Sequence, residues 1–516
     1  MLLLAASLAL AYGEKVHEEL TEEALRLILG DSTSLAGPVP PAPEGVDPAS
    51  YVPPLLDPEA QSKAGVAALV MRIDNYGRNT PDLAAAWTAR YPSPGDFDRW
   101  ALKELLLLNP DQDVYGFDKF DIDSSRLATV SVSARRPDDD YRNRERLAHG
   151  PDRKPQPGVP DDPIILNMGK LGALSSQAHA HYGLDQLEFS EDPAVLQTDP
   201  PRFAVAAGWP GGPIVTLAAE MTQSHLDLST IAALEGYPLL SSAYAGHAFH
   251  YLEDTGNPIH TVQVGLYGFF KDAFFQRLGK SFLTGGGYLG ELPSLASIGI
   301  GILTNHHTIS EQLAEKKLLA GDARLAAAIT SDDTEFLAKL PSAAAGDYGL
   351  EATRALIKAS APDGAPMYAG TRAIVDKRYR KWGVSFDDKN DDPDATLREG
   401  VTSAEMDAFW GLQERSFKRA ATAVRRVWTI HDGAIQGALA SAEASDALRN
   451  ATLDRLVRRQ LELRAEADER RAKYLANPPV ASSARSTQPA VLAVEVGAAT
   501  LLGFGLSRGL RRIRRS

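Results

Sequence analysis

The chain has 516 residues and a formal net charge of -13, with 44% hydrophobic and 23% charged residues, which is the composition of a globular protein. Its acidity argues against a protein that holds duplex nucleic acid on a broad basic surface. The absence of cysteine excludes disulfide bonds and thiolate metal sites, so any metal ion must be held by histidine, carboxylate or backbone groups.

The first eleven residues, MLLLAASLALA, are apolar and end in Ala9-Leu10-Ala11. Small residues at positions 9 and 11, separated by one residue, are typical of a signal-peptide cleavage site. We therefore predict a signal peptide over residues 1–11 and an exported chain that begins at Tyr12. The other interpretation of this segment is a buried N-terminal helix.

Apolar residues recur at helical spacing along most of the chain and strand signals are sparse, so the predicted fold class is all-α. The first predicted helix opens at His17 and stops at Gly30, and the second ends near Gly77. Later helices are predicted over residues 213–233, 237–254, 306–317, 404–438 and 443–475. Prolines and polar runs predict loops over 31–58 and 109–165, the latter as a long surface insertion.

The C-terminal end carries a second membrane signal. Residues 476–488 are rich in proline and serine and predict a linker. Residues 489–507 are apolar except for Glu495, and five arginines lie in the basic tail to residue 516. A segment of this length is about enough to cross a bilayer, and the basic cluster fits the positive-inside rule. A transmembrane helix over 489–507 is therefore expected, with an interfacial amphipathic helix as the alternative.

The strongest chemical signal is the run HYLEDTGNPIH, which extends from His250 to His260. His250 and Asp254 are four residues apart, so they project from one face of a helix. The Gly-Asn-Pro sequence that follows ends the helix and turns the chain, which lets His260 return to the same place. A second pair, His307 and Glu311, has the same spacing. Imidazole and carboxylate donors in this pattern favour zinc.

HYLEDTGNPIH resembles the metal motif H-Y-L-G-D-x-x-Q-P-M-H of bacterial zinc-dependent phospholipase C, a fold shared with single-strand-specific zinc nucleases. The resemblance covers roughly residues 12–311. It implies an all-helical domain over 12–320 that holds three zinc ions, with insertions at 83–178 and 261–304. The helical region 321–475 has no counterpart in it.

The resemblance also implies individual ligands. The mature N-terminus is Tyr12, which would bind through its amine and carbonyl, and the pattern from Gly77 to Asp82 matches the family's aspartate ligand. His181 is the best match for the next histidine, with His179 as the alternate and His149 as a third choice. The implied metal ligands are Tyr12, His17, Asp82, His181, His250, Asp254, His260, His307 and Glu311.

In the implied arrangement, Asp254 bridges two zinc ions that share a water or hydroxide, and Asp82 is also a candidate catalytic base. One of these two ions would be held by Asp82, His181 and His250, and the other by Tyr12 and His17. The third ion would be held by His260, His307 and Glu311. His247, one turn before His250, is expected to be a hydrogen-bonded core residue, with a role in supporting the ligands as the alternative, and His225 and His431 are expected to be structural.

Two details favour the phospholipase branch: Glu311 as the last ligand, and Gly256 where the nucleases carry histidine. The short gap from Tyr12 to His17 favours the nucleases. We expect an exported, membrane-associated zinc phosphodiesterase that acts on phospholipid headgroups. The alternatives are a single-strand nuclease and a membrane-tethered metal-binding protein without turnover. Duplex nucleic acid is not expected as a partner, and the sequence leaves the oligomeric state open.

Overall fold

The fold comes from a computed structural model, which describes residues 14–30, 58–94, 125–135, 137, 218–261, 310–343, 346–378 and 402–476. Regular structure within these ranges is helical, without a strand, so the predicted all-α class is confirmed. Its elements are α1 (Glu14–Leu29), α2 (Pro58–Asn79), α3 (Ala84–Arg90), α5 (Arg126–Ala134), α10 (Ala218–Leu234), α11 (Pro238–Gly256), the 3-10 helix η5 (Pro258–Thr261), α14 (Ala323–Thr330), α15 (Thr334–Leu337), α16 (Tyr348–Arg378), α18 (Ser403–Leu439), α19 (Ala442–Ala476) and a helical segment at 310–319.

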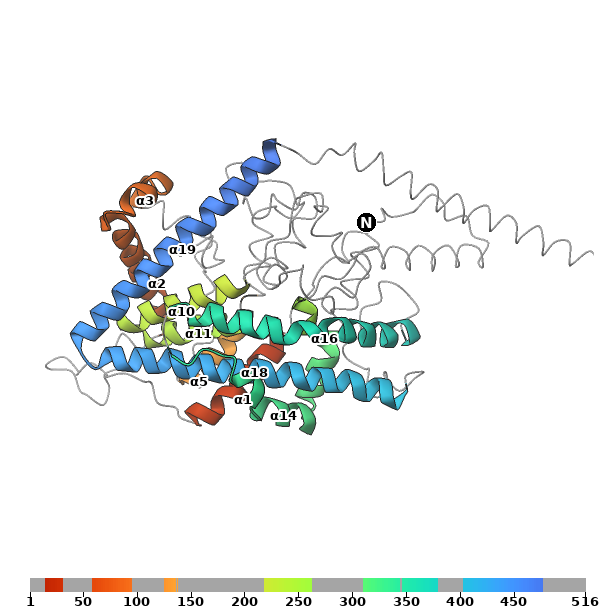
Figure 1. Cartoon of the computed structure of the whole chain (residues 1–516). Helices are drawn as coiled ribbons and strands as arrows, with labels where there is room; N and C mark the ends of the chain where they lie inside the picture. Colours follow the sequence, from red (N-terminus) through yellow and green to blue (C-terminus); the bar gives the residue numbers. More distant parts are fainter. Residues whose placement is uncertain are drawn as a thin grey trace, which may run out of the picture.

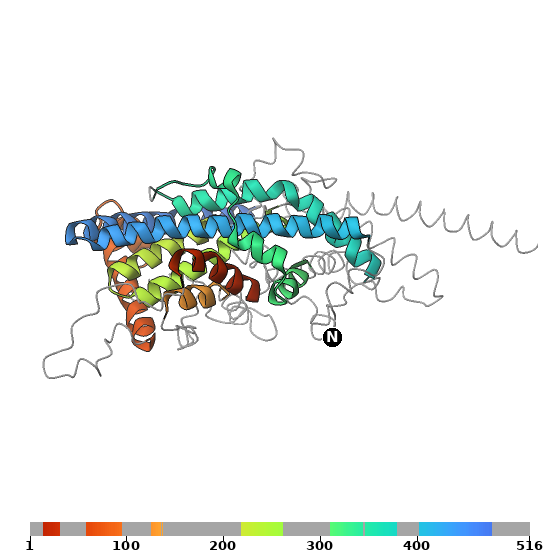
Figure 2. The same cartoon turned by 90° about the horizontal axis from the view of Figure 1, so that it is seen from below.

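Helices α10 and α11 form a tightly packed pair at the centre of the molecule. The long helices α16 and α18 run beside each other and cover this pair, while α1 and α5 pack against α11 and each other (Figures 1 and 2). Helix α19 folds back from α18 and contacts α10 and α2. Helix α11 is therefore enclosed by α1, α5, α10, α16 and α18, and water is kept from most of its length.

One large apolar core joins helices that are distant in the sequence. It includes Val16 of α1, Phe249 of α11, Leu356 of α16 and Trp428 of α18, all of them buried. A smaller core lies between α2, α3, α10, α11 and α19. Residues on both sides of position 320, where the catalytic domain was expected to end, thus share the larger core. Burial of each large apolar side chain contributes roughly 1.5–3 kcal/mol to the free energy of folding, so a core of this size holds α11 in place.

Helix α1 ends at Gly30 as the sequence predicts, and it begins at Glu14, three residues before the predicted start at His17. Val16, Leu20 and Ala24 lie on one stripe and are fully buried. Gly30 ends the helix with φ of +62°, a left-handed conformation that glycine adopts without steric cost. The buried stripe fixes the rotation of α1 about its axis, and with it the direction in which His17 points.

Two segments differ from the predictions. Helix α2 continues past Gly77 to Asn79, and the missing side chain of Gly77 leaves room for the indole of Trp87 to pack against the backbone. Part of the expected surface loop at 109–165 is the buried helix α5, in which Leu127, Val130 and Ala134 form an apolar stripe. The surrounding proline-rich and charged residues obscured this short stripe in the sequence.

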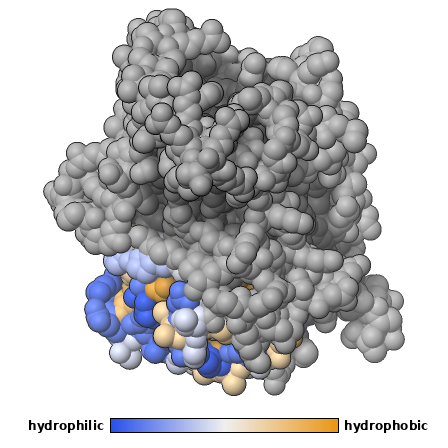
Figure 3. All heavy atoms as spheres, turned by 90° about the vertical axis from the view of Figure 1, so that its right-hand side faces the viewer, coloured by the Kyte–Doolittle hydropathy of each residue, from blue (hydrophilic) through white to orange (hydrophobic). Residues whose placement is uncertain are grey.

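None of the described helices is both long and apolar enough to cross a membrane. The expected signal peptide (1–11), linker (476–488, beyond its first residue) and transmembrane segment (489–507) lie outside the described residues. The described surface visible in Figure 3 is mostly hydrophilic. The exposed large apolar side chains of the described part are spread over different elements: Leu27, Ile28, Met71, Leu319 and Leu439.

Candidate metal centre

The centre is built on the C-terminal half of α11. This helix begins with Pro238 at its first position, where a missing N–H costs nothing, and it ends at Gly256, before Asn257, whose backbone is extended. His250 and Asp254 occupy successive turns and are fully buried. The chain then turns through η5, which brings the buried His260 back beside Asp254. The placement of these three residues follows the spacing in the sequence.

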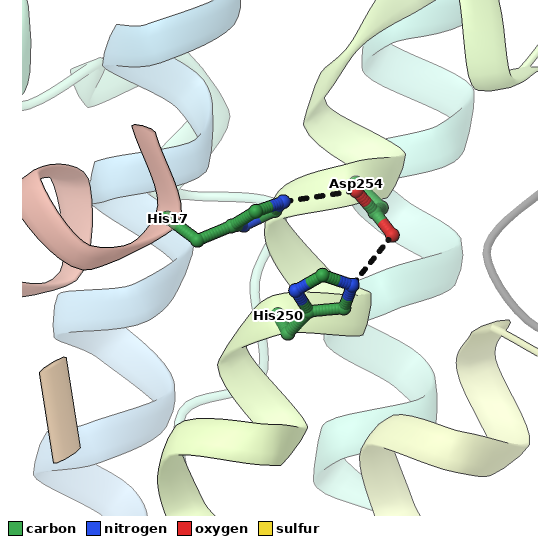
Figure 4. A group of neighbouring side chains, drawn as sticks. All are labelled: His17, His250 and Asp254. Atoms are coloured by element: carbon green, nitrogen blue, oxygen red, sulfur yellow. Dashed lines mark ion pairs between the residues drawn. The ribbon is translucent and has the colours of Figure 1, made fainter. Parts of the chain in front are cut away.

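The side chain of Asp254 faces two imidazole rings from different helices. Its Oδ1 lies 3.3 Å from Nε2 of His17 on α1, and its Oδ2 lies 3.4 Å from Nε2 of His250 (Figure 4). All three side chains have no exposed surface. Their ligand atoms lie within 4.8 Å of one another, and the group could hold a metal ion.

Hydrogen bonds behind the two rings determine which nitrogen faces Asp254. Nδ1 of His250 donates to the backbone carbonyl of Ala134, 2.7 Å away at the end of α5. Nδ1 of His17 lies 2.7 Å from Oε2 of Glu253. A carbonyl only accepts hydrogen bonds, so Nδ1 of His250 carries a proton. Burial raises the pKa of Glu253 well above its usual value, so this carboxyl and His17 share a proton, and a cation at Nε2 of His17 would place that proton on Nδ1. In the neutral rings, the lone pairs are then on Nε2, directed at the carboxylate.

This geometry fits a metal ion. Two neutral imidazole nitrogens facing two carboxylate oxygens are four acceptors, and they repel one another unless a cation or protons lie between them. In a tetrahedral zinc site, adjacent nitrogen and oxygen ligands lie roughly 3.3–3.6 Å apart. The separations of 3.3 and 3.4 Å at Asp254 fall in this interval. The donor set, its spacing and its burial therefore all suit a divalent metal ion.

A second pair of donors adjoins this group. Nε2 of His260 lies 3.3 Å from Oε1 of Glu311, and Nδ1 of His260 lies 3.9 Å from Oδ1 of Asp254. Asn257 donates to the same oxygen of Glu311 at 3.1 Å. Burial raises the pKa of Glu311 well above its usual value, and Glu315 raises it further, while the Asn257 hydrogen bond opposes them. A cation beside this carboxylate would favour its charged form.

Asp82 is the described candidate that lies apart from the group. Its side chain is 61% exposed and accepts a hydrogen bond from Arg458 of α19 at 2.7 Å, which lowers its pKa. Asp82 lies in the exposed turn between α2 and α3. The buried carboxylate of this region is Asp74, which accepts from Trp87 and Arg78. The structure therefore corrects the expected position of Asp82.

Three of the implied ligands lie outside the described ranges: the N-terminal Tyr12, His181 with its alternates His179 and His149, and His307. Of the remaining implied ligands, the structure brings five together around Asp254: His17, His250, Asp254, His260 and Glu311.

The sequence did not identify the groups that orient the ligands. Glu253 and Thr21 support His17, the carbonyl of Ala134 supports His250, and Asn257 supports Glu311. The one available signal was Glu253, a carboxylate three residues after His250 and adjacent to Asp254. The contribution of a backbone carbonyl carries no signal in the sequence.

Two of the expected core histidines, His225 and His431, are buried and hydrogen-bonded, and His247 is buried. Nε2 of His431 lies 2.8 Å from Ser229 and its Nδ1 lies 2.7 Å from the hydroxyl of Tyr348. His225 lies with Nδ1 2.8 Å from the carbonyl of Met221. Burial lowers the pKa of both imidazoles to about 4. Both imidazoles are neutral near pH 7. Because they are buried histidines outside the metal group, substitutions at these two positions can serve as controls.

Comparison with known proteins identifies no relative of the chain. No protein-family model, no curated protein and no solved structure matches it.

Proposed function

We propose that the protein is a zinc-dependent phosphodiester hydrolase of the phospholipase C type, with a trinuclear metal site. The observation that carries this proposal is the buried Asp254 carboxylate, each of whose oxygens faces Nε2 of a different histidine. A carboxylate with separate partners on its two oxygens is suited to bridge two metal ions, as the motif resemblance implies. In two-metal hydrolases such a pair of ions acts on a single phosphoryl group.

The donor set supports zinc over the other common divalent ions. Imidazole and carboxylate ligands in a cysteine-free chain suit zinc, whereas magnesium and calcium prefer oxygen ligands alone. His17 and His250 would each hold one of the two ions bridged by Asp254. His260 and Glu311 would hold the third. Tyr12, His181 and His307 are assigned to complete these sites on the motif resemblance alone.

Bound zinc would supply a hydroxide near neutral pH and stabilise negative charge that develops on phosphorus. The residues of the chain orient and enclose that chemistry. Glu253 and the carbonyl of Ala134 hold the rings of His17 and His250 with Nε2 toward Asp254. The buried walls of α1, α5 and α11 lower the local dielectric, which strengthens the interaction of these ligands with a cation. Asp82, exposed and paired with Arg458, is left out of this catalytic assignment.

The choice of a phospholipid substrate rests on Glu311 and Gly256. A Cβ atom on Gly256 would lie 2.8 Å from Cβ of Ala420 in α18, so the position has no room for a histidine side chain. A metal centre that lacks a histidine there fits the phospholipase branch of the motif better than the nuclease branch. The predicted signal peptide and apolar C-terminal segment support an exported enzyme held near a membrane surface.

The test is to measure metal content and hydrolysis with the full chain. After zinc loading, we expect release of the phosphorylated headgroup from phosphatidylcholine vesicles and no comparable cleavage of single-stranded DNA. Asp254→Asn should lose both zinc and activity, because the bridging charge is removed while the side-chain shape is retained. His431→Gln, a matched change at a buried histidine outside the group, should keep both.

Other outcomes would replace the proposal. Cleavage of single-stranded DNA alone would assign the nuclease alternative, and bound zinc with neither activity would assign a metal-binding protein without turnover. An Asp254→Asn variant that is active and replete with metal would exclude the proposed site.

A further inference from the structure

Glu253 lies immediately before Asp254 but contacts the opposite side of the His17 ring. Its Oε2 accepts from Nδ1 of His17 at 2.7 Å, whereas Asp254 faces Nε2 of the same ring at 3.3 Å. Both carboxylates come from one turn of α11, and the ring comes from α1. His17 is therefore held between two adjacent carboxylates that can act on it in different ways, one on the nitrogen that faces the metal group and one behind it.

The second oxygen of Glu253 is also occupied by α1. The hydroxyl of Thr21, one turn after His17, donates to Oε1 at 2.6 Å. His17, Thr21 and Glu253 have no exposed surface. Two hydrogen bonds to two oxygens fix the rotation of the carboxylate, so it presents Oε2 to the ring in one orientation. Thr21 thereby acts on His17 through Glu253.

The two histidines beside Asp254 differ in what stands behind them. His250 donates from Nδ1 to a neutral backbone carbonyl, that of Ala134, whereas His17 donates to a carboxylate. A carboxylate acceptor on Nδ1 makes the other ring nitrogen a better electron donor to a metal ion, and it also fixes the ring orientation. With a cation bound at Nε2 of His17, the charged form of Glu253 is favoured, and it would strengthen Nε2 of His17 in a way that the carbonyl of Ala134 cannot match for His250.

We propose that Glu253 is a positioning residue that raises the metal affinity of the His17 side of the centre, and that Thr21 holds Glu253 in the orientation this requires. The inference rests on the proposed metal centre and deepens it: the two subsites on Asp254 differ in strength, and a carboxylate that binds no metal sets the difference. Glu253 touches neither substrate nor metal and acts through the ring of His17.

The decisive variant is Glu253→Gln in the full chain. Glutamine can still accept from Nδ1 of His17 and meet the hydroxyl of Thr21, so it removes the charge and leaves the shape. We expect zinc affinity, measured by competition with a chromophoric chelator, to fall about 10–100-fold. The melting temperature of the metal-free protein should not fall, because the change removes a buried charge. Glu220→Gln, at a nearly buried carboxylate bonded to Arg354 and Arg459, is the matched control with unchanged zinc affinity.

Thr21→Val provides a second, milder variant of the same shape. It should lower zinc affinity in the same direction but less, and the double variant Glu253→Gln/Thr21→Val should bind no more weakly than Glu253→Gln alone. Thr353→Val, at a buried threonine whose hydroxyl bonds the Gly349 carbonyl, controls for the loss of a buried hydroxyl. Non-additive loss of affinity is the signature of action through Glu253, which a general loss of packing would not produce.

The outcomes separate this inference from the proposed function. Unchanged zinc affinity in Glu253→Gln, together with loss of zinc in Asp254→Asn, would overturn the positioning role and leave the metal centre intact. The positioning role would also be overturned if the losses of zinc affinity in Glu253→Gln and Thr21→Val add independently in the double variant. Equal losses of zinc affinity in the controls Glu220→Gln and Thr353→Val would overturn it as well. Retention of zinc by Asp254→Asn would instead overturn the metal centre itself.

Discussion

Among single residues, the orientation of each imidazole decides whether the centre can bind a cation. Acceptors behind Nδ1 leave Nε2 of His17 and His250 directed at different oxygens of Asp254. The two rings lie close, with their centroids 4.1 Å apart, yet they do not compete for the same carboxylate oxygen. In the proposed centre, each ring would therefore serve a separate metal ion.

This separation predicts the effect of removing either ring. His17→Gln and His250→Gln should each lower the zinc content of the full chain without abolishing it, because the other histidine keeps its own oxygen of Asp254. Metal analysis after gel filtration measures this directly. His225→Gln, a change at a buried histidine outside the group, serves as the control. Zinc content equal to that of the unmodified chain in both variants would contradict the assignment.

A pH effect is predicted at His431. Burial lowers its pKa to about 4, with Arg126 and Arg455 acting in the same direction and Asp432 opposing them. The ordinary value is about 6.5, so the unfolded chain takes up a proton between these two values while the folded chain does not. Stability is therefore lost as pH falls from about 6.5 to 4, by at most roughly 3 kcal/mol from this residue.

His431→Gln tests this prediction, since glutamine offers an acceptor and a donor without titrating. Urea unfolding of metal-free protein at several pH values should show a shallower loss of stability between pH 6.5 and 4 in the variant than in the unmodified chain. Parallel curves would show that His431 does not supply the expected proton uptake.

Among the helices, the close approach of α5 to α11 is required to orient His250. The contact occurs at Gly246, where an added Cβ would collide with the carbonyl oxygen of Val130 and lie 2.7 Å from Cβ of Ser133. This approach brings the carbonyl of Ala134, at the end of α5, within reach of Nδ1 of His250. A glycine one turn before His250 thus sets the position of that residue's hydrogen-bond partner.

Gly246→Ala should accordingly push α5 away from α11. We expect a loss of stability of about 1–3 kcal/mol from overpacking, with a weaker affinity for zinc. Gly437→Ala in α18 is a matched control, because an added Cβ there meets nothing within 4 Å. That control should stabilise the protein by roughly 0.5–1 kcal/mol. Urea unfolding of the two variants measures the contrast, and a stabilised Gly246→Ala would refute the close-approach argument.

Helical periodicity was enough to predict α1, α11, α18 and α19 to within a few residues at each end, because each has a sustained apolar pattern. The i, i+4 spacing of His250 and Asp254 predicted their common face. The short helix α5 was missed because its apolar stripe is brief. Asp82 was misplaced because a spacing pattern says nothing of how the end of α2 packs on Trp87.

For the whole molecule, the C-terminal helices belong to the structure that holds the centre. Helices α16 and α18 both contact α11, α16 also contacts η5, and Ser416 of α18 donates to the carbonyl of Gly256 at 2.8 Å. Sequence patterns could not predict this, since a contact between residues 256 and 416 leaves no local trace. The motif resemblance ended near residue 311, and the helices beyond it complete the same core.

This shared core predicts the result of truncation. A chain that ends at residue 320 would expose the apolar faces of α1 and α11 that α16 and α18 cover, so we expect it to be insoluble or to bind no zinc. A chain that ends at residue 476 keeps every described helix, and we expect it to be soluble and to bind zinc. A folded, zinc-binding fragment 1–320 would show that the C-terminal helices are dispensable.

X-ray absorption at the zinc edge of the loaded full chain tests the metal centre most directly. The proposed ligands predict a first shell of nitrogen and oxygen at about 2.0–2.1 Å with scattering from imidazole rings, and weaker imidazole scattering in His17→Gln. A shell of oxygen ligands alone, or a spectrum unchanged by loss of His17, would contradict the centre described around Asp254.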